Sequence, residues 1–197
     1  MKNVLNNFKF IPKSITEFIK YRRNLLILRR RFKNSIISKP LEITSTNLNN
    51  IYISDEVIIG SNAILRILNN CKLFIGEGTH IGPYCHISGT ENKIIIKRDV
   101  LISDRVFIST THHRYYDIKK PINRQGFISK GDVIIGDECL IGIGSCILSG
   151  VNIGKHSIIG ANSVVTKNIP PYSVAVGNPA KVIKQYIFSE KKWVKKG

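Results

Sequence analysis

The stretch IGDECLIGIGSCILSGVNIGKHSIIGANSVVTK, residues 135–167, decides the fold. A large aliphatic residue returns at every sixth position: Ile135, Ile141, Ile147, Ile153, Ile159 and Val165. The residues that follow these positions are Gly136, Gly142, Leu148, Gly154, Gly160 and Thr166. The fourth residue after the aliphatic one is small, with Val151 as the exception: Cys139, Ser145, Ser157 and Ser163. The sequence is therefore a repeat of hexapeptides.

A period of six fits neither of the common elements. A helical period of 3.6 would scatter the aliphatic residues around the helix, and strand alternation would need apolar residues at the positions between them as well. Each unit instead fits a short extended piece with one large inward side chain, followed by a tight turn that glycine eases. Such units coil the chain into a solenoid whose flat faces are parallel sheets.

The same unit recurs upstream in blocks that each keep the period of six but are shifted in phase relative to one another. The blocks are led by Ile53 and Ile59, by Ile75, Ile81 and Ile87, and by Ile96, Ile102 and Ile108. Insertions are therefore expected near residues 66–74, 89–94 and 110–132, projecting from corners of the solenoid. The longest carries His112 and His113, and loops of this length in a compact repeat protein are usually functional.

Composition favours one core of moderate size. The chain has 197 residues, 43% of them hydrophobic, which is enough for one core and short for two domains. The sequence shows neither an apolar run of the roughly 18 residues that span a bilayer nor the apolar core of a signal peptide, so we expect a cytoplasmic protein. Cys71, Cys85, Cys139 and Cys146 form no CxxC pair and are predicted to be reduced, structural residues.

The net charge of +17 belongs to the two ends. Residues 1–40 hold eleven Lys or Arg against Glu17, which gives +10, and residues 181–197 hold six Lys against Glu190, which gives +5. Ser14 and Glu17 form a capping-box signature for a basic helix. This helix either packs over the open end of the solenoid or lies on anionic lipid. Nucleic acid is disfavoured as a partner, because no aromatic platform or binding motif accompanies the charge.

These patterns divide the chain into three parts. We expect a basic, helical N-terminal segment over residues 1–45, a solenoid domain over residues 46–185 with an inserted loop at residues 110–132, and a basic tail over residues 186–197.

The run from Ile135 to Ile183, which ends in NIPPYSVAVGNPAKVI, resembles the hexapeptide-repeat acyltransferases, in particular the O-acetyltransferases of sugars and surface polysaccharides. The resemblance spans roughly residues 50–185. It implies an all-β fold, a left-handed parallel β-helix of triangular section, assembled as a homotrimer that binds acetyl-CoA between neighbouring subunits. It implies no metal.

The family's chemistry is acyl transfer from a thioester to a hydroxyl, which needs a base for the hydroxyl proton, a task that suits histidine. In the sugar acetyltransferases the catalytic histidine follows a repeat isoleucine by five positions, which from Ile108 implies His113, with His112 as the alternative. The sequence shows no nucleophilic Ser or Cys signature, which favours direct attack over an acyl-enzyme. Asp117 is the nearest candidate to orient His113.

The resemblance also implies the acetyl-CoA contacts. Ile143 and Ala161 match the groove, whereas Thr166, Lys167 and Lys181 match positions near the nucleotide, and a backbone N–H near Gly142 or Ile143 would stabilise the thioester oxygen. The family's glycan-binding asparagine has no clear counterpart, so the acceptor stays open between a polysaccharide, lipopolysaccharide or capsule precursor, lipid-linked or not, and a small free sugar. A γ-type carbonic anhydrase and a non-catalytic, membrane-associated solenoid are the weaker alternatives.

Overall fold

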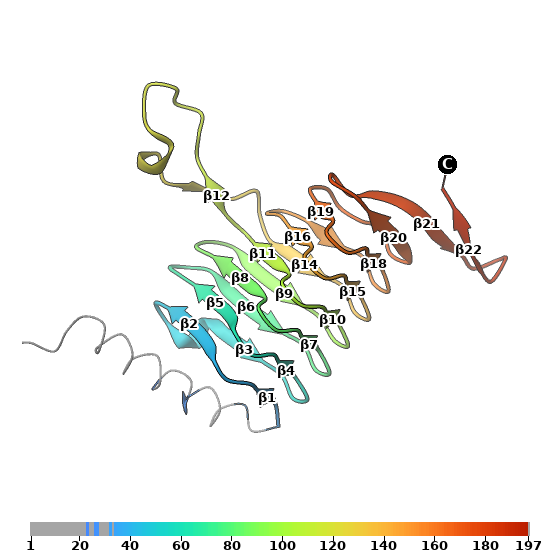
Figure 1. Cartoon of the computed structure of the whole chain (residues 1–197), viewed down its shortest axis with the longest axis horizontal. Helices are drawn as coiled ribbons and strands as arrows, with labels where there is room; N and C mark the ends of the chain where they lie inside the picture. Colours follow the sequence, from blue (N-terminus) through green and yellow to red (C-terminus); the bar gives the residue numbers. More distant parts are fainter. Residues whose placement is uncertain (1–22, 24–25, 28–31, 33, 197) are drawn as a thin grey trace, which may run out of the picture.

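The computed structural model describes residue 23, residues 26–27, residue 32 and residues 34–196. In this part of the chain, parallel strands wind into a left-handed β-helix, which confirms the predicted fold class (Figure 1). Each of the first five described coils contributes one short strand to each of three sheets, here called sheets A, B and C in chain order. The edges where the chain passes from one sheet to the next are edges AB, BC and CA.

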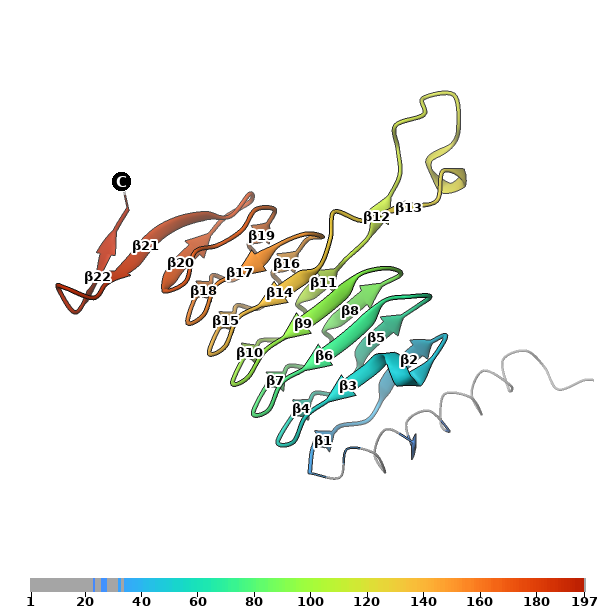
Figure 2. The ribbon, with the colours of Figure 1, turned by 180° about the vertical axis from the view of Figure 1, so that it is seen from behind.

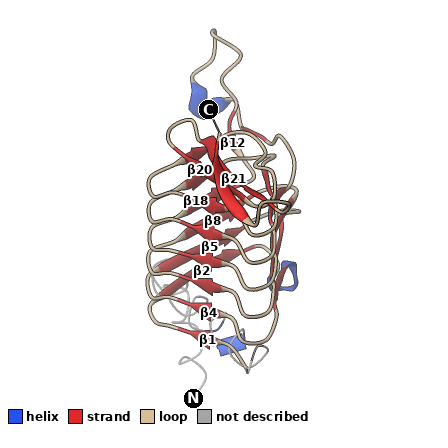
Figure 3. Cartoon of the chain, turned by 90° about the vertical axis from the view of Figure 1, so that its right-hand side faces the viewer, coloured by secondary structure: helices blue, strands red, loops and turns tan. Residues whose placement is uncertain are grey.

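Sheet A forms one face of the prism and ends in the C-terminal hairpin. Its strands, in spatial order, are β1 (Ile36–Ile37), β4 (Ile58–Ile59), β7 (His80–Ile81), β10 (Leu101–Ile102), β15 (Leu140–Ile141), β18 (Ile158–Ile159), β20 (Ser173–Val176), β21 (Lys181–Ile187) and β22 (Lys192–Lys195). Pairing is parallel up to β20 and antiparallel in the hairpin. Figure 3 shows these strands stacked coil upon coil.

Sheets B and C form the other two faces. Sheet B contains β2 (Leu41–Ser45), β5 (Ala63–Ile67), β8 (His86–Gly89), β11 (Phe107–Ser109), β16 (Cys146–Ile147) and β19 (Val164–Val165). Sheet C contains β3 (Ile51–Ile53), β6 (Lys72–Ile75), β9 (Lys93–Ile96), β14 (Val133–Ile135) and β17 (Asn152–Ile153), and faces the viewer in Figure 2. A short 3-10 helix, η2 (Leu48–Asn50), joins β2 to β3.

The repeat aliphatics build the core, as the period of six predicts. Ile135, Ile141, Ile147, Ile153 and Ile159 are all essentially inaccessible to solvent. Each lies in register with its equivalent one coil away, as Ile141 does between Ile102 and Ile159. Stacking of equivalent side chains therefore fills the interior of the prism with one continuous apolar column.

The small residue of each repeat does more than fit the corner. Ser163 Oγ accepts from the Gly177 N–H at 3.0 Å, whereas Ser145 Oγ and Ser157 Oγ donate to the backbone carbonyls of Gly160 and Pro170 in the next coil, each at 2.9 Å. Cys139 Sγ does the same to Gly154 O at 3.1 Å. Serine and cysteine recur there because a buried carbonyl needs a donor.

Two boundaries differ from those expected. The solenoid begins before residue 46, because β1 and β2 already pair in parallel with β4 and β5. The described part of the expected tail, residues 186–196, belongs to a hairpin, since β22 pairs with β21. The first coil holds only one six-residue step, from Ile37 to Ile43, and the hairpin holds none, so the sequence gives little sign of either pairing.

The predicted basic helix falls almost wholly outside the described residues. Arg23, Leu26 and Ile27 are helical and exposed. No helix within the described part of the chain is long and apolar enough to cross a membrane.

Candidate active site

All three predicted insertions leave the prism at edge BC. They connect β5 to β6, β8 to β9 and β11 to β14. The longest, residues 110–132, stands well away from the coils as an arm (Figures 1 and 2). Its two branches pair as the antiparallel strands β12 (His112–His113) and β13 (Phe127–Ile128).

This hairpin separates the two candidate bases. His112 and His113 are neighbours in β12, so their side chains point to opposite faces of the ribbon. His113 is exposed, and its ring lies 4.6 Å from the ring of Phe127, its cross-strand partner. His112 is half-buried opposite Ile128. The predicted base is thus presented to solvent on a ribbon, backed by an aromatic ring.

Hydroxyl groups fix the foot of the arm to the solenoid. Thr110 is fully buried and its hydroxyl donates to Glu91 O at 2.8 Å. On the returning branch, Ser149 Oγ accepts from Lys130 N–H at 2.7 Å and lies 3.2 Å from Ser129 Oγ. Both branches of the arm are therefore hydrogen-bonded to edge BC. The anchoring residues lie within three residues of β12 on the outgoing branch and of β13 on the returning branch.

Gln125 organises the tip of the arm. Its amide nitrogen donates to Asp117 O and Lys120 O, each at 2.8 Å, and its amide oxygen accepts from Asp117 N–H at 3.0 Å. The Asp117 carboxylate accepts from Lys119 N–H and pairs with Lys120. Asp117 therefore serves the turn near η3 (Ile122–Arg124), and its recorded contacts do not include His113. Neither Gln125 nor Phe127 stands out in the sequence, because neither belongs to a repeat or a motif.

The arm carries an exposed apolar and basic surface. Ile118 is 96% exposed, and four further apolar residues of the arm are also exposed: Tyr115, Tyr116, Ile122 and Phe127. Residues 110–132 hold five Lys or Arg against two Asp, a net charge of +3. Such a surface suits both a covering protein and an anionic substrate.

The residues matched to acetyl-CoA contacts lie on two different edges. Ile143 and Ala161 follow sheet A strands and stack at edge AB, where Asn162 N–H donates to Ile143 O at 2.8 Å. Lys181 lies near this edge, since its neighbour Ala180 donates to Val164 O. Thr166 and Lys167 follow β19 at edge BC, the edge of His113. One chain does not bring the two groups together, because sheet B separates them.

Hydrogen bonding excludes the Gly142 N–H as a donor to the thioester oxygen, and burial excludes two cysteines as nucleophiles. The Gly142 N–H donates to Ile159 O at 2.8 Å as part of the coil ladder, so it is not free to bind a thioester oxygen. Burial raises the pKa of the Cys71 and Cys85 thiols to about 11, which keeps them protonated near neutral pH. Neither thiol is therefore a competent nucleophile.

The remaining histidines do not converge on the arm. His80 lies on sheet A, His86 on sheet B and His156 at edge CA. Among the residues that the structure describes, no group of three His, Cys, Asp or Glu side chains could hold a metal ion.

Comparison with known proteins gives a family match and a full-length relative. Residues 132–167 match a family model described as the hexapeptide repeat of succinyl-transferase. WbbJ of Escherichia coli, which is named as an O-acetyl transferase of lipopolysaccharide biosynthesis, is 30% identical over 185 residues, covering 90% of this chain and 93% of its own.

Two solved structures share the fold. A variant of the N-acyltransferase AntD from Bacillus cereus, in complex with dTDP-4-amino-4,6-dideoxyglucose and coenzyme A, superposes with a TM-score of 0.64 at 26% identity, over 77% of this chain and 80% of that one. The polySia-specific acetyltransferase NeuO superposes with a TM-score of 0.54 at 28% identity, over 78% of this chain and 72% of that one.

Proposed function

Because the chain belongs to the hexapeptide-repeat acyltransferase family and is an acyltransferase, we propose that it transfers an acetyl group from acetyl-CoA to a sugar hydroxyl. The acceptor is a surface polysaccharide, lipopolysaccharide or capsule precursor. The observation that carries this proposal is the exposed His113 on an arm at edge BC, in a chain similar over its length to an enzyme named as an O-acetyl transferase.

His113 acts as the general base. Its neutral ring accepts the proton of the acceptor hydroxyl as the oxygen attacks the thioester carbonyl, and the resulting imidazolium returns that proton to the departing CoA sulfur. The Ile143 N–H is the proposed donor to the thioester oxygen, because Gly142 N–H is already used in the ladder. Neither step needs a covalent acyl-enzyme.

The site is completed by a neighbouring subunit of a homotrimer. Edge BC of one chain, with His113, Thr166 and Lys167, meets edge AB of the next, with Ile143, Ala161 and Lys181. Threefold symmetry then makes three equal sites. The exposed apolar surface of the arm supports this arrangement, because a neighbour packed against Ile118 and Phe127 would remove it from water.

The basic surfaces suit an anionic acceptor or membrane. The arm has a net charge of +3, and residues 1–40 carry +10. Each Lys or Arg near anionic lipid contributes about 1 kcal/mol of binding free energy. We therefore place the enzyme in the cytoplasm, at the inner membrane face where lipid-linked glycans would reach it.

Product analysis tests the function. The full chain is incubated with acetyl-CoA and a panel of lipid-linked glycans, soluble oligosaccharides and small free sugars, and acetylated products are detected by mass spectrometry. We expect acetylated oligosaccharide or lipid-linked glycan, formed roughly 10²- to 10⁴-fold more slowly with His113→Ala. Product confined to free monosaccharides would favour the small-sugar alternative, and hydrolysis of acetyl-CoA without transfer would contradict the proposal.

Mixed trimers test the shared site. His113→Ala damages edge BC, whereas Ala161→Trp would fill the groove at edge AB. Co-expressed with different tags, the two inactive variants should together recover about a quarter of wild-type activity, since about a quarter of the interfaces pair two intact edges. A chain that is monomeric by light scattering yet fully active would overturn the arrangement.

A further inference from the structure

A second cavity lies at edge CA, away from the two edges of the proposed active site. It has a volume of about 250 Å³ and is lined by rings alone: His156, Tyr172, Tyr186, Phe188 and Trp193. His156 and Tyr172 occupy the corners before β18 and β20, and the other three come from the hairpin of β21 and β22. The hairpin thus extends sheet A beyond β20, and its rings form the cavity together with the rings at the last two corners of edge CA.

The rings hold one another edge to face. The Phe188 ring lies 4.8 Å from Tyr172 at 86° and 5.2 Å from Tyr186 at 80°, and Tyr186 lies 5.6 Å from Trp193 at 69°. Edge-to-face packing fixes rings without covering both of their faces. Phe188 is 63% exposed and Trp193 is 36% exposed. Rings that served only as the core of the hairpin would be buried. The exposure of these rings therefore indicates a surface for a ligand.

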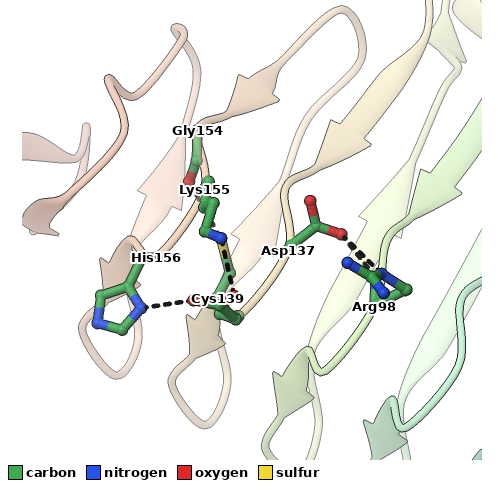
Figure 4. Close-up of polar contacts among 7 residues, drawn as sticks. Arg98, Asp137, Cys139, Gly154, Lys155 and His156 are labelled. Carbon is green, nitrogen blue, oxygen red and sulfur yellow. Dashed lines mark hydrogen bonds and ion pairs between the residues drawn. The ribbon is translucent and has the colours of Figure 1, made fainter.

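A charged pair fixes the polar side of the cavity. His156 Nδ1 lies 3.0 Å from Glu138 Oε2, and Lys155 Nζ lies 2.8 Å from Glu138 Oε1. Figure 4 labels His156 and Lys155, with these contacts as dashed lines. These two contacts, that to Lys155 first, lower the pKa of Glu138, whose charge is thus matched by Lys155. His156 is held at the cavity while its carboxylate partner is neutralised by a neighbour.

The surroundings are basic. Lys184 and Lys195 are cross-strand partners two residues along from the Tyr186 and Trp193 pair, so they lie on the same face of the hairpin as the rings. Glu190 is paired with Lys192 at 2.9 Å. The net charge of +5 over residues 181–197 therefore favours an anionic ligand and disfavours a cation.

We propose that this cavity binds one sugar ring of an acidic glycan. Aromatic faces match the apolar C–H face of a pyranose, the tyrosine hydroxyls and the indole N–H can bind its hydroxyls, and the lysines match a carboxylate or phosphate. The volume is below the range of about 300–1,000 Å³ typical of larger ligands, so it suits a single residue of a chain.

The site deepens the proposed function and rests on it for the source of the glycan. Because edge CA carries neither His113 nor Ile143, the cavity is a docking subsite rather than part of the reaction. A polymer held there by one residue has its other residues at high local concentration near the arms. The enzyme would then favour acidic polymers over their isolated units.

Trp193 is the only tryptophan in the chain, so its fluorescence reports directly on the cavity. The full chain is titrated with oligosialic acid and oligogalacturonate, with maltohexaose as the neutral comparison. We expect a saturable change with the acidic oligosaccharides. Phe188→Ala should weaken it by about tenfold, the scale of one aromatic contact. The pair Lys184→Gln and Lys195→Gln should weaken acidic oligosaccharides more than maltohexaose.

Tyr52→Ala is the matched control, since Tyr52 is an exposed ring stacked on Phe74 of sheet C. It should leave the titration unchanged, as should His113→Ala. No saturable change with any oligosaccharide, or one indifferent to Phe188→Ala in a folded variant, overturns the proposal. A response to phosphatidylglycerol vesicles in its place would assign the surface to a membrane. If the full chain transfers acetyl groups but shows no oligosaccharide binding at the cavity, only the subsite is contradicted. If it binds oligosaccharide there but transfers no acetyl group, the proposed function is contradicted.

Discussion

Edges AB and BC are built from the same hexapeptide, yet successive coils touch closely at edge AB, whereas all three insertions leave the coils at edge BC. We call edge AB the closed edge and edge BC the open edge. At edge AB, the residue after the buried aliphatic is glycine in four coils, at Gly60, Gly82, Gly142 and Gly160, whereas Ser38, Ser103 and Val176 hold the position in the others. At edge BC the same position is never glycine in the described coils, which have Thr44, Arg66, Ser88, Ser109, Leu148 and Thr166 there.

Close approach between coils explains the difference. A Cβ on Gly142 would come within 2.6 Å of Ala161 N, which no real side chain tolerates. At edge BC the strands β2, β5 and β8 continue past this position, and the chain leaves the coils at this edge in all three insertions. Glycine therefore marks where coils must touch, and its absence marks the edge that is available for chemistry.

The largest expected effect is at the open edge. His113→Ala should lower kcat by roughly 10²- to 10⁴-fold with little change in acetyl-CoA affinity, because loss of a general base has effects of that size. His112→Ala, on the opposite face of the same strand, should cost much less. Steady-state kinetics of the two variants decides between them. If their effects are exchanged, His112 is the base, and if both stay active, neither histidine is.

The closed edge should respond in stability rather than in catalysis. Gly142→Val forces a side chain into the backbone of the next coil and should cost about 2–3 kcal/mol in the free energy of unfolding. Leu148→Ala changes the equivalent position at edge BC, where Leu148 is partly exposed, and should cost less than 1 kcal/mol. Chemical denaturation measures both. Equal losses would show that the two edges are packed alike.

The repeat was predictable because it is local. The inward position of Ile141 and the small partner at Ser145 follow from six residues of sequence, and the positions of the insertions follow from slips in that count. The face on which a residue lies is not local, since each insertion resets the phase. The placing of His113 and Thr166 at the same edge, with the insertion at residues 110–132 between them, therefore appears only in the structure.

Other features lacked any pattern to read. The first coil pairs LEITS with AILRI, two longer strands in which buried and outward residues alternate, so the ordinary strand pattern hides the hexapeptide. The C-terminal hairpin alternates lysines with rings, so Tyr186 and Trp193 look like part of a basic tail until their pairing is seen. By contrast, the sequence already marks the open edge, because Leu148 and Thr166 stand at the repeat position that Gly142 and Gly160 hold at the closed edge.

A moderate effect is expected for Lys181, which lies near the closed edge and is matched to the nucleotide of acetyl-CoA. Lys181→Ala should raise KM for acetyl-CoA by about tenfold, a loss of one exposed charge contact to phosphate, with a smaller change in kcat. Lys184→Ala, three residues on in the same strand, is the control and should leave KM unchanged. A large fall in kcat with Lys181→Ala would place this lysine in the chemical step instead.

The smallest effect concerns His86, on sheet B between the two edges. Its Nε2 is buried without a hydrogen-bond partner in the described structure, and its ring meets Phe107 edge to face. Burial, and then the charge of Arg66, lower the pKa of His86, with Glu42 opposing. As pH falls below about 6.5, the unfolded chain therefore takes up this proton before the folded one, and stability is lost.

His86→Leu should remove that part of the pH dependence. The free energy of unfolding, measured by denaturant titration between about pH 5 and pH 8, should fall less steeply towards acid in this variant than in the wild type. His80→Leu is the matched control, because His80 is the equivalent outward residue in sheet A but is exposed. Its profile should follow the wild type. The contradicting result would be the same dependence of the unfolding free energy on pH in the wild type, His86→Leu and His80→Leu. It would mean that the folded chain protonates His86 as readily as the unfolded chain does, and that water reaches this side chain on sheet B.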